Sequence, residues 1–231
     1  MKKNITSATA LFVSMLFVLL ASTGCSKDEP DDGTVKDYDG NIYQTVQIGT
    51  QTWMASNLMV TCFNDGTMIK LEENNDLWKQ LSGPGYCWYG NSSGQFRKDY
   101  GALYNFHAAA SDKLCPTGWR VPTLNDYYEL SMHLGGESIA GGPMKETGMV
   151  YWDSPNTGAT NETGFNGRGG GFRSHTCTGG FGNLKLFGYW WTSSEHNATT
   201  AYLRALNYDN PYLGASITDK QVGCSVRCIK N

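Results

Sequence analysis

The chain has 231 residues and a formal net charge of −3, and it contains 28 glycines, 13 tyrosines and 7 tryptophans. Its basic residues are scattered and fewer than its acidic ones, which argues against nucleic acid as a partner. The glycines and large aromatic residues favour a loop-rich domain whose turns are anchored by rings, rather than a helical bundle.

The N-terminal segment has the layout of a bacterial secretory signal. Lys2 and Lys3 precede an apolar run over 5–21, and three small residues then lead to Cys25. A cysteine in this place resembles a lipoprotein processing site, at which Cys25 becomes the lipidated first residue of the mature protein. A cleaved signal without lipid and an uncleaved anchor are the alternatives. We therefore expect a signal peptide over 1–24, a lipidated cysteine with a flexible acidic tether over 25–36, and one domain over 37–231.

The domain begins with a pattern typical of a β-hairpin. Asp39, Gly40 and Asn41 form a turn signal, and a β-rich run over 42–48 follows. A second turn at 49–51 is predicted to lead into a strand at 52–54. Helices are expected next, at 74–81 and 100–110.

The strongest helix signal spans 124–134. Thr123 occupies the N-cap position and Asp126 follows three residues later, which is an acidic variant of the capping box. Two glycines end this helix, and the glycine-rich, polar sequence over 136–188 then predicts a long loop region. Strands are expected to return at 189–192, 201–206, 214–217 and 225–229.

Cysteine usage favours disulfides. Besides Cys25, an exported chain of this sequence has an even number of cysteines, which is typical of a disulfide framework. They are Cys62, Cys87, Cys115, Cys177, Cys224 and Cys228. Their spacing does not choose among the possible pairings. A metal-thiolate site is disfavoured, because the chain has no CxxC pair and its 4 histidines lack ligand spacing near the cysteines.

Several blocks in fixed order resemble one family. They are DGNIYQTVQIG at 39–49, QTWMASNL at 51–58, YGALYNFHAA at 100–109, LCPTGWRVPT at 114–123, YWWTSSE at 189–195, YLR at 202–204 and SVRCI at 225–229. Together they resemble the Fibrobacter succinogenes major paralogous domain, which is widespread in lipoproteins of Bacteroidetes and Fibrobacteres. The resemblance covers residues 36–231. It implies no activity, because the family is defined by sequence rather than by a known reaction.

A looser resemblance indicates the fold. The block over 119–123 with its helix, and the terminal strand, resemble pieces of formylglycine-generating enzymes and the wider C-type-lectin-like fold. This implies an α+β domain with small twisted antiparallel sheets, two main helices and a long glycine-rich loop region that carries binding. In that fold a cysteine near a helix bridges to the final strand, which implies Cys115–Cys228. Cys177–Cys224 would then tie the long loop to the last strand, and Cys62–Cys87 would close a local loop.

Candidate binding residues lie in the loops at 164–183 and 195–212. Trp190 and Trp191 suit stacking on a sugar, but adjacent strand residues point to opposite faces, so at most one is expected to be exposed. The ligand-binding candidates are Trp191, Glu195, Asn207, Asp209, Asn210 and Arg173. The oxygen-bearing residues of this set suit calcium, although the calcium signatures of sugar-binding lectins are missing. We assign no metal and no cofactor, with calcium as the alternative.

Catalytic patterns are weak in this sequence. Cys224 and Cys228 compare with the paired active-site cysteines of formylglycine-generating enzymes, but residues four apart on a strand lie too far apart to bridge each other. Ser193, Ser194 and His196 are adjacent without a glycine elbow. A pair of helical acid and base side chains, Glu129 and His133, is equally well explained by a solvated helix face.

We therefore expect a non-catalytic binding module for a glycan or glycoprotein, held at the membrane by a lipid anchor. The acidic run after Cys25 resembles the surface-export signals of Bacteroidetes lipoproteins, which implies an outer-membrane lipoprotein exposed at the cell surface. A structural or adhesive protein-interaction module is the first alternative. An oxidative enzyme of the formylglycine-generating type is the second.

Overall fold

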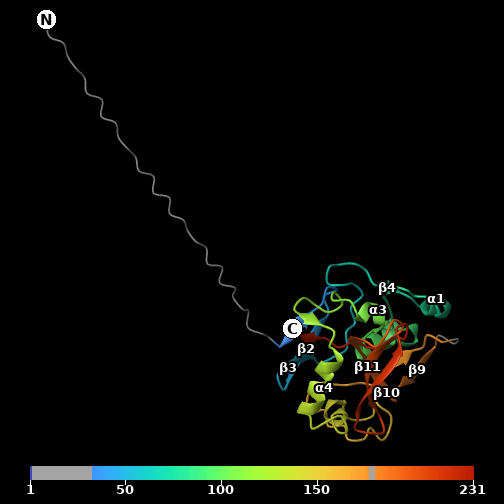
Figure 1. Ribbon diagram of the computed structural model, residues 1–231. Helices are drawn as coiled ribbons and strands as arrows, with labels where there is room; N and C mark the ends of the chain where they lie inside the picture. Colours follow the sequence, from blue (N-terminus) through green and yellow to red (C-terminus); the bar gives the residue numbers. More distant parts are fainter. Residues whose placement is uncertain (2–32, 177–179) are drawn as a thin grey trace. The chain divides into compact units, whose positions relative to one another are not determined.

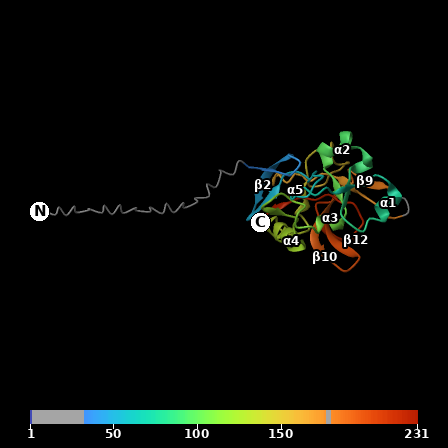
Figure 2. The ribbon, with the colours of Figure 1, turned by 90° about the horizontal axis from the view of Figure 1, so that it is seen from above.

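Apart from Met1, the computed structural model describes residues 33–176 and 180–231, which are drawn in colour in Figures 1 and 2. The expected signal peptide, Cys25 and most of the acidic tether lie outside the described residues, as does Cys177. In the described part of the chain, no helix is both long and apolar enough to cross a membrane. The folded part has a mixed α+β architecture, in which sheets predominate over short helices.

The elements of the described residues are as follows. The strands are β1 (Thr34–Lys36), β2 (Ile42–Ile48), β3 (Gln51–Met54), β4 (Lys70–Leu71), β5 (Gly85–Cys87), β6 (Leu103–Tyr104), β7 (Trp119–Arg120), β8 (Gly170–Arg173), β9 (Phe181–Leu184), β10 (Phe187–Glu195), β11 (Thr200–Asn207), β12 (Leu213–Asp219) and β13 (Ile229–Lys230). The helices are α1 (Asn75–Lys79), α2 (Ser93–Tyr100), α3 (Phe106–Ala109), α4 (Leu124–His133) and α5 (Gly141–Met144), with a 3-10 turn η1 at Tyr89–Asn91.

The first sheet joins the beginning of the domain to its end, in the strand order β1-β2-β3-β13-β7. β2 and β3 form the predicted hairpin, and Gly49 supplies the positive φ of 61° in its turn. β13 lies between β3 and β7, so that Ile229 pairs with both Trp53 and Arg120. A disulfide joins Cys115 to Cys228, which are 113 residues apart in the sequence, and holds this arrangement together. The predicted Cys115–Cys228 pair is confirmed.

The second sheet has the order β12-β11-β10-β8-β9, and a small third sheet has the order β4-β5-β6. Figure 1 labels β9, β10 and β11 of the second sheet and β4 of the third. β10, β11 and β12 form an antiparallel meander, whereas β8 pairs with β10 in parallel at Gly171 and Gly188. Trp190 and Trp191 point to opposite faces of β10 and fill two different core clusters. Both faces of this strand are therefore covered at Trp190 and Trp191.

Helix α4 begins at the residue that the sequence predicted. The Thr123 hydroxyl accepts a hydrogen bond from the Asp126 N–H at 3.1 Å, and the Asp126 carboxylate accepts one from the Thr123 N–H at 2.6 Å. This completes the capping box. Tyr127 and Leu130 are buried in the core beside Trp190.

Two other helical segments differ from the expectation. The helix expected over 100–110 forms only as α3. Leu103 pairs with β5 instead, and the buried Asn105 is the N-cap, whose side-chain oxygen accepts a hydrogen bond from the Ala108 N–H. Helix α2 was not predicted, since its sequence SGQFRKDY is largely polar and has little apolar periodicity.

The closing strand is shorter than expected. It spans only Ile229–Lys230 as β13, and Ser225 makes an isolated bridge to Trp190 instead.

The predicted Cys62–Cys87 bridge is wrong, because both residues are free thiols. Adjacent residues of β5 point to opposite faces, so Tyr86 and Cys87 pack in different clusters. Cys87 is buried in the cluster of Trp78, whereas Cys62 is only partly buried and makes an isolated bridge to Met68. Cys224 is a free and buried thiol, and its predicted partner Cys177 lies outside the described residues.

Candidate functional site

Trp191 is buried and has no surface to offer a ligand. Its exposed fraction is 0%, and its indole N–H donates to the Tyr104 carbonyl at 2.8 Å. The ring packs edge-on against Phe106, with centroids 5.3 Å apart. The prediction that Trp191 contacts a ligand is therefore wrong, because the core covers β10 at this residue.

Arg173 is also buried and holds neighbouring segments together. Its guanidinium donates to the carbonyl oxygens of Glu72 and Glu73, and to the Asn75 side chain at 3.0 Å. It lies over the rings of Trp78 and Phe181, with its central carbon 4.5 and 5.2 Å from their centroids. Arg173 is thus a structural residue at the end of β8, and its assignment to ligand binding is wrong.

The four oxygen-bearing candidates do not converge on one point. Glu195 lies opposite Ala201 in the sheet and Asn207 lies opposite Phe187, so the two are at opposite ends of β11. Six residues of strand separate these ends by roughly 20 Å. Glu195 accepts a hydrogen bond from Lys220 at 2.8 Å.

The turn between β11 and β12 binds a lysine ammonium group. The side-chain oxygens of Asn207, Asp209 and Asn210 accept hydrogen bonds within this turn. The Nζ atom of the buried Lys145 donates to the carbonyl oxygens of Asn207 and Asn210, each at 2.9 Å, and of Thr157 at 2.8 Å. Desolvation lowers the pKa of Lys145 to about 8, against the opposing effect of Asp209. Within residues 33–176 and 180–231, no group of three or more His, Cys, Asp and Glu side chains could hold a metal ion.

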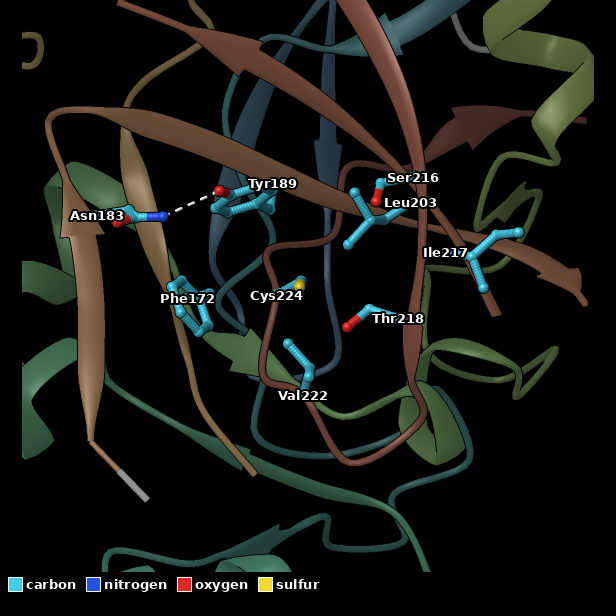
Figure 3. A pocket seen from close by; sticks show the side chains of 9 residues that line it. All are labelled: Phe172, Asn183, Tyr189, Leu203, Ser216, Ile217, Thr218, Val222 and Cys224. Carbon is cyan, nitrogen blue, oxygen red and sulfur yellow. Dashed lines mark hydrogen bonds between the residues drawn. The ribbon is translucent and has the colours of Figure 1, made fainter. Parts of the chain in front are cut away.

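A pocket of about 240 Å³ lies on one face of the second sheet (Figure 3). We call it the sheet pocket. Each strand of the sheet contributes to it, and the segment over 222–224 closes the opposite side. Its lining residues are Phe172, Asn183, Tyr189, Leu203, Ser216, Ile217, Thr218, Val222 and Cys224.

One wall of the sheet pocket is aromatic. The rings of Phe172 and Tyr189 meet edge to face at 5.8 Å, and Tyr189 also stacks on Phe187 at 5.4 Å. The Asn183 amide donates to the Tyr189 hydroxyl oxygen at 3.0 Å (Figure 3). This bond leaves the Tyr189 hydroxyl proton and the Asn183 carbonyl oxygen for a ligand.

The facing wall carries hydroxyl groups and no charge. Ser216 and Thr218 alternate along β12, whereas the Ile217 side chain points away from the pocket (Figure 3). Desolvation raises the pKa of the Tyr189 hydroxyl and of the Cys224 thiol, so both groups stay neutral near neutral pH. The site thus combines rings with uncharged hydroxyl and amide groups.

The close approach of β8 and β9 beside the pocket requires glycine at position 171. This residue has a φ of +63°, and a Cβ atom there would lie 2.2 Å from the Gly182 carbonyl oxygen. Part of the glycine-rich region that the sequence indicated as loop therefore forms a strand pair at one side of the site.

Comparison with known families identifies the domain. Residues 46–230 match the model of the Fibrobacter succinogenes major domain. The chain belongs to this family. No curated protein and no solved structure matched the chain. Every residue that lines the sheet pocket lies inside the matched range, so the pocket is part of the Fibrobacter succinogenes major domain itself.

The sequence interpretation located binding in loops, whereas the sheet pocket is built from strands. Phe172, Asn183 and Leu203 fall within the expected loop ranges, but Tyr189 and Thr218 do not. The signal that was missed is the alternation of Ser216, Ile217 and Thr218. It places two hydroxyl groups on one face of β12, beside Leu203 of the neighbouring strand.

Proposed function

We propose that this protein is a non-catalytic binding module of a surface-exposed lipoprotein, and that its sheet pocket takes one neutral sugar unit of a glycan or glycoprotein. The observation that carries the proposal is the uncharged lining, with aromatic rings and an amide group on one wall and hydroxyl groups on the facing wall.

The chemistry of the lining suits a sugar ring. A pyranose has an apolar face that packs on an aromatic ring, and a rim of hydroxyl groups that both donate and accept hydrogen bonds. Burying a charged ligand here would be costly, because none of the lining residues supplies an opposite charge. The volume of about 240 Å³ is below the usual range for drug-sized ligands, which favours a single ring over a longer chain.

The cysteine and serine residues support a non-catalytic role. Cys228 is in a disulfide and Cys224 is a buried thiol of raised pKa, so the two do not form a free active-site pair. The Ser194 hydroxyl accepts a hydrogen bond from the Leu124 N–H at 3.0 Å, while His196 contacts Thr200. Neither arrangement activates a nucleophile.

The remaining parts of the proposal rest on the sequence and on topology. The signal layout and Cys25 support a lipid anchor in the outer membrane, and the acidic run supports export to the cell surface. The order of elements supports a C-type-lectin-like fold within the α+β class. An early hairpin and the helices precede a long irregular segment, and β13 returns beside β3.

An array of glycans and host glycoproteins tests the proposed ligand. The purified full-length protein is applied with calcium and with a chelator, and bound ligands are titrated against Tyr189→Phe and Thr218→Val. Each substitution removes one hydroxyl group with little change of shape, so we expect roughly ten-fold weaker binding from each. Tyr38→Phe, at an exposed tyrosine outside the pocket, is the control and should bind like the wild type.

The array also separates the alternatives. Unchanged affinity in both pocket variants would show that the ligand binds elsewhere. Binding that disappears with chelator would favour the calcium alternative. No glycan binding at all, together with retention of a protein partner, would favour the protein-interaction module.

A further inference from the structure

β12 is the outermost strand of the second sheet and pairs only with β11 among the described strands. Three consecutive residues of this strand, Ala215, Ser216 and Ile217, are exposed. The Ile217 side chain is 44% exposed. The outer edge of the sheet is therefore uncovered here.

The hydrogen bonds at the two ends of β12 show which residues face outward. The Lys220 N–H donates to the Thr199 carbonyl, toward β11, whereas the Leu213 N–H donates to the Glu137 carbonyl, away from β11. Alternate residues of an antiparallel strand bond to the same neighbour, so Ala215 and Ile217 direct their N–H and C=O groups away from β11. Within residues 33–176 and 180–231, these groups have no hydrogen-bond partner.

This edge lacks the features that usually prevent pairing. Natural sheets protect an exposed edge with lysine, proline, a bulge or a very short strand. β12 has the sequence LGASITD and spans 7 residues, without lysine or proline, and its pairing with β11 is continuous. Residues 214–218 carry no charge, so a second copy of the same strand would meet no like-charge repulsion.

An open groove of about 630 Å³ runs beside the same edge, on the face covered by α4. We call it the edge groove. It is lined by Thr123, Leu124, Asn125, Tyr128, Glu137, Ser194, Arg204 and Ala215. Tyr128 is 50% exposed. Ala215 pairs with Arg204, which places both side chains on the α4 face of the sheet.

We propose that two copies of this chain pair through β12, antiparallel, about a twofold axis at Ser216. In this register Ala215 lies opposite the partner's Ile217 and Ile217 lies opposite the partner's Ala215. The two outward-facing residues then form two hydrogen-bonded pairs, and Ser216 faces the partner's Ser216 between them. The second sheets of the two copies join into one.

The same register places an apolar side chain in the edge groove. Residues opposite each other in a sheet have their side chains on the same face, so the partner's Ile217 lies beside Ala215 on the α4 face, over Leu124 and Tyr128. Each copy thus presents both an exposed apolar side chain and the groove that receives the partner's. A symmetric pair of this kind closes on itself and forms no fibre, which favours a second copy over an extended segment of another protein.

Disulfide trapping in cells that produce the full-length protein tests this register. Ser216→Cys places two thiols opposite each other across the twofold axis, within reach of a disulfide. Thr218→Cys is the matched control, because its two copies would lie four residues apart along the strands, roughly 13 Å. Both are made with Cys224→Ala, since Cys224 lines the same pocket as Ser216 and Thr218.

We expect a reducible dimer band from Ser216→Cys and none from Thr218→Cys. Sedimentation of the detergent-solubilised wild type should give twice the monomer mass, and Ile217→Lys should restore the monomer with an unchanged circular dichroism spectrum. A monomeric wild type, or equal trapping of the two cysteine variants, would overturn the proposal. Trapping of Ser216→Cys to a different protein would also overturn it, in favour of strand addition by that protein. None of these outcomes depends on whether the sheet pocket binds a sugar.

Discussion

The buried cationic side chains of Lys145, Arg173 and Arg227 are bound mainly by carbonyl oxygens rather than by carboxylates. Lys145 donates to three main-chain carbonyl groups, and Arg227 donates to the Phe165 carbonyl and to the Asn57 side chain. A buried charge needs such partners, and an irregular segment supplies carbonyl groups that no strand has used. Each cation therefore fixes a segment that has no regular structure of its own.

Replacing Lys145 by methionine should destabilise the domain. The substitution keeps the length of the side chain and relieves the desolvation of the ammonium group, but it leaves three buried carbonyl oxygens without a donor. We expect the second effect to dominate and the free energy of unfolding to fall by roughly 3 kcal/mol, measured by urea denaturation.

Lys36→Met is the control for this substitution, because Lys36 is exposed. It should change the free energy of unfolding by less than about 0.5 kcal/mol. Equal effects of the two substitutions would contradict the assigned role of Lys145.

At the scale of an element, α4 depends on one carboxylate at its first turn. Asp126 accepts hydrogen bonds from two nitrogens of Arg120, at 2.6 and 2.8 Å, and from the Thr123 N–H. Desolvation raises the pKa of Asp126, but the bonds from Arg120 and Thr123 outweigh it and lower the pKa overall. The folded state thus binds this proton less tightly than the unfolded state.

Stability should therefore depend on Asp126 at acid pH. A carboxyl group with a lowered pKa stabilises fully above its unfolded pKa of about 4, and this contribution is lost as the pH falls through the folded value. Asp126→Asn should lower the free energy of unfolding by about 1–2 kcal/mol at neutral pH and flatten its decline below pH 4. Denaturation series over pH check both effects. Glu129→Gln, at an exposed site on the same helix, should leave the decline unchanged.

Elements whose start or turn is set by neighbouring residues were predictable from the sequence. Elements that depend on pairing with distant segments were not. The hairpin over 42–54 and the start of α4 follow from turn residues and a capping box. The segment around Leu103 has a helical pattern but pairs with β5, because tertiary pairing overrides propensity. The expected Cys62–Cys87 pair is wrong for a similar reason, since only the structure shows that Cys87 is buried in the cluster of Trp78 while Cys62 is partly exposed.

The sheet pocket illustrates the same limit at the scale of the whole molecule. Its residues come from five strands and a closing segment, which are brought together by the pairing of β8 with β10 and of β10 with β11. No local pattern encodes these pairings. The chemistry of Trp191 suits a ligand, but it does not reveal that the core covers this residue completely.

Pairing through β12 would give the domain two binding sites that act together. A twofold axis perpendicular to the joined sheet keeps both sheet pockets on the same face, on either side of Ser216. A ligand that displays several sugar units would then engage both pockets, and the second contact would form at high effective concentration. A pocket of about 240 Å³ that takes a single ring could reach useful avidity in this way.

Attachment to a membrane would fix the orientation of such a pair. The proposed attachment depends on a lipid at Cys25. If Cys25 carries the lipid, Cys25→Ser should release the protein from the membrane fraction, because the polar and acidic tether offers no other apolar anchor after the signal is removed. Fractionation of cells, followed by immunoblotting, measures the release. Asn231, at the far end of the sequence, gives a neutral control in Asn231→Ser, which should stay in the membrane fraction.

Protease treatment of intact cells then tests the side of the membrane on which the domain lies. A surface-exposed lipoprotein is cleaved in intact cells that retain a periplasmic marker, whereas a periplasmic one is cleaved only after lysis. Membrane-bound Cys25→Ser would contradict the lipid anchor. Protection of the wild type in intact cells would contradict surface exposure while leaving the anchor in place, so the two parts of the localisation can fail separately.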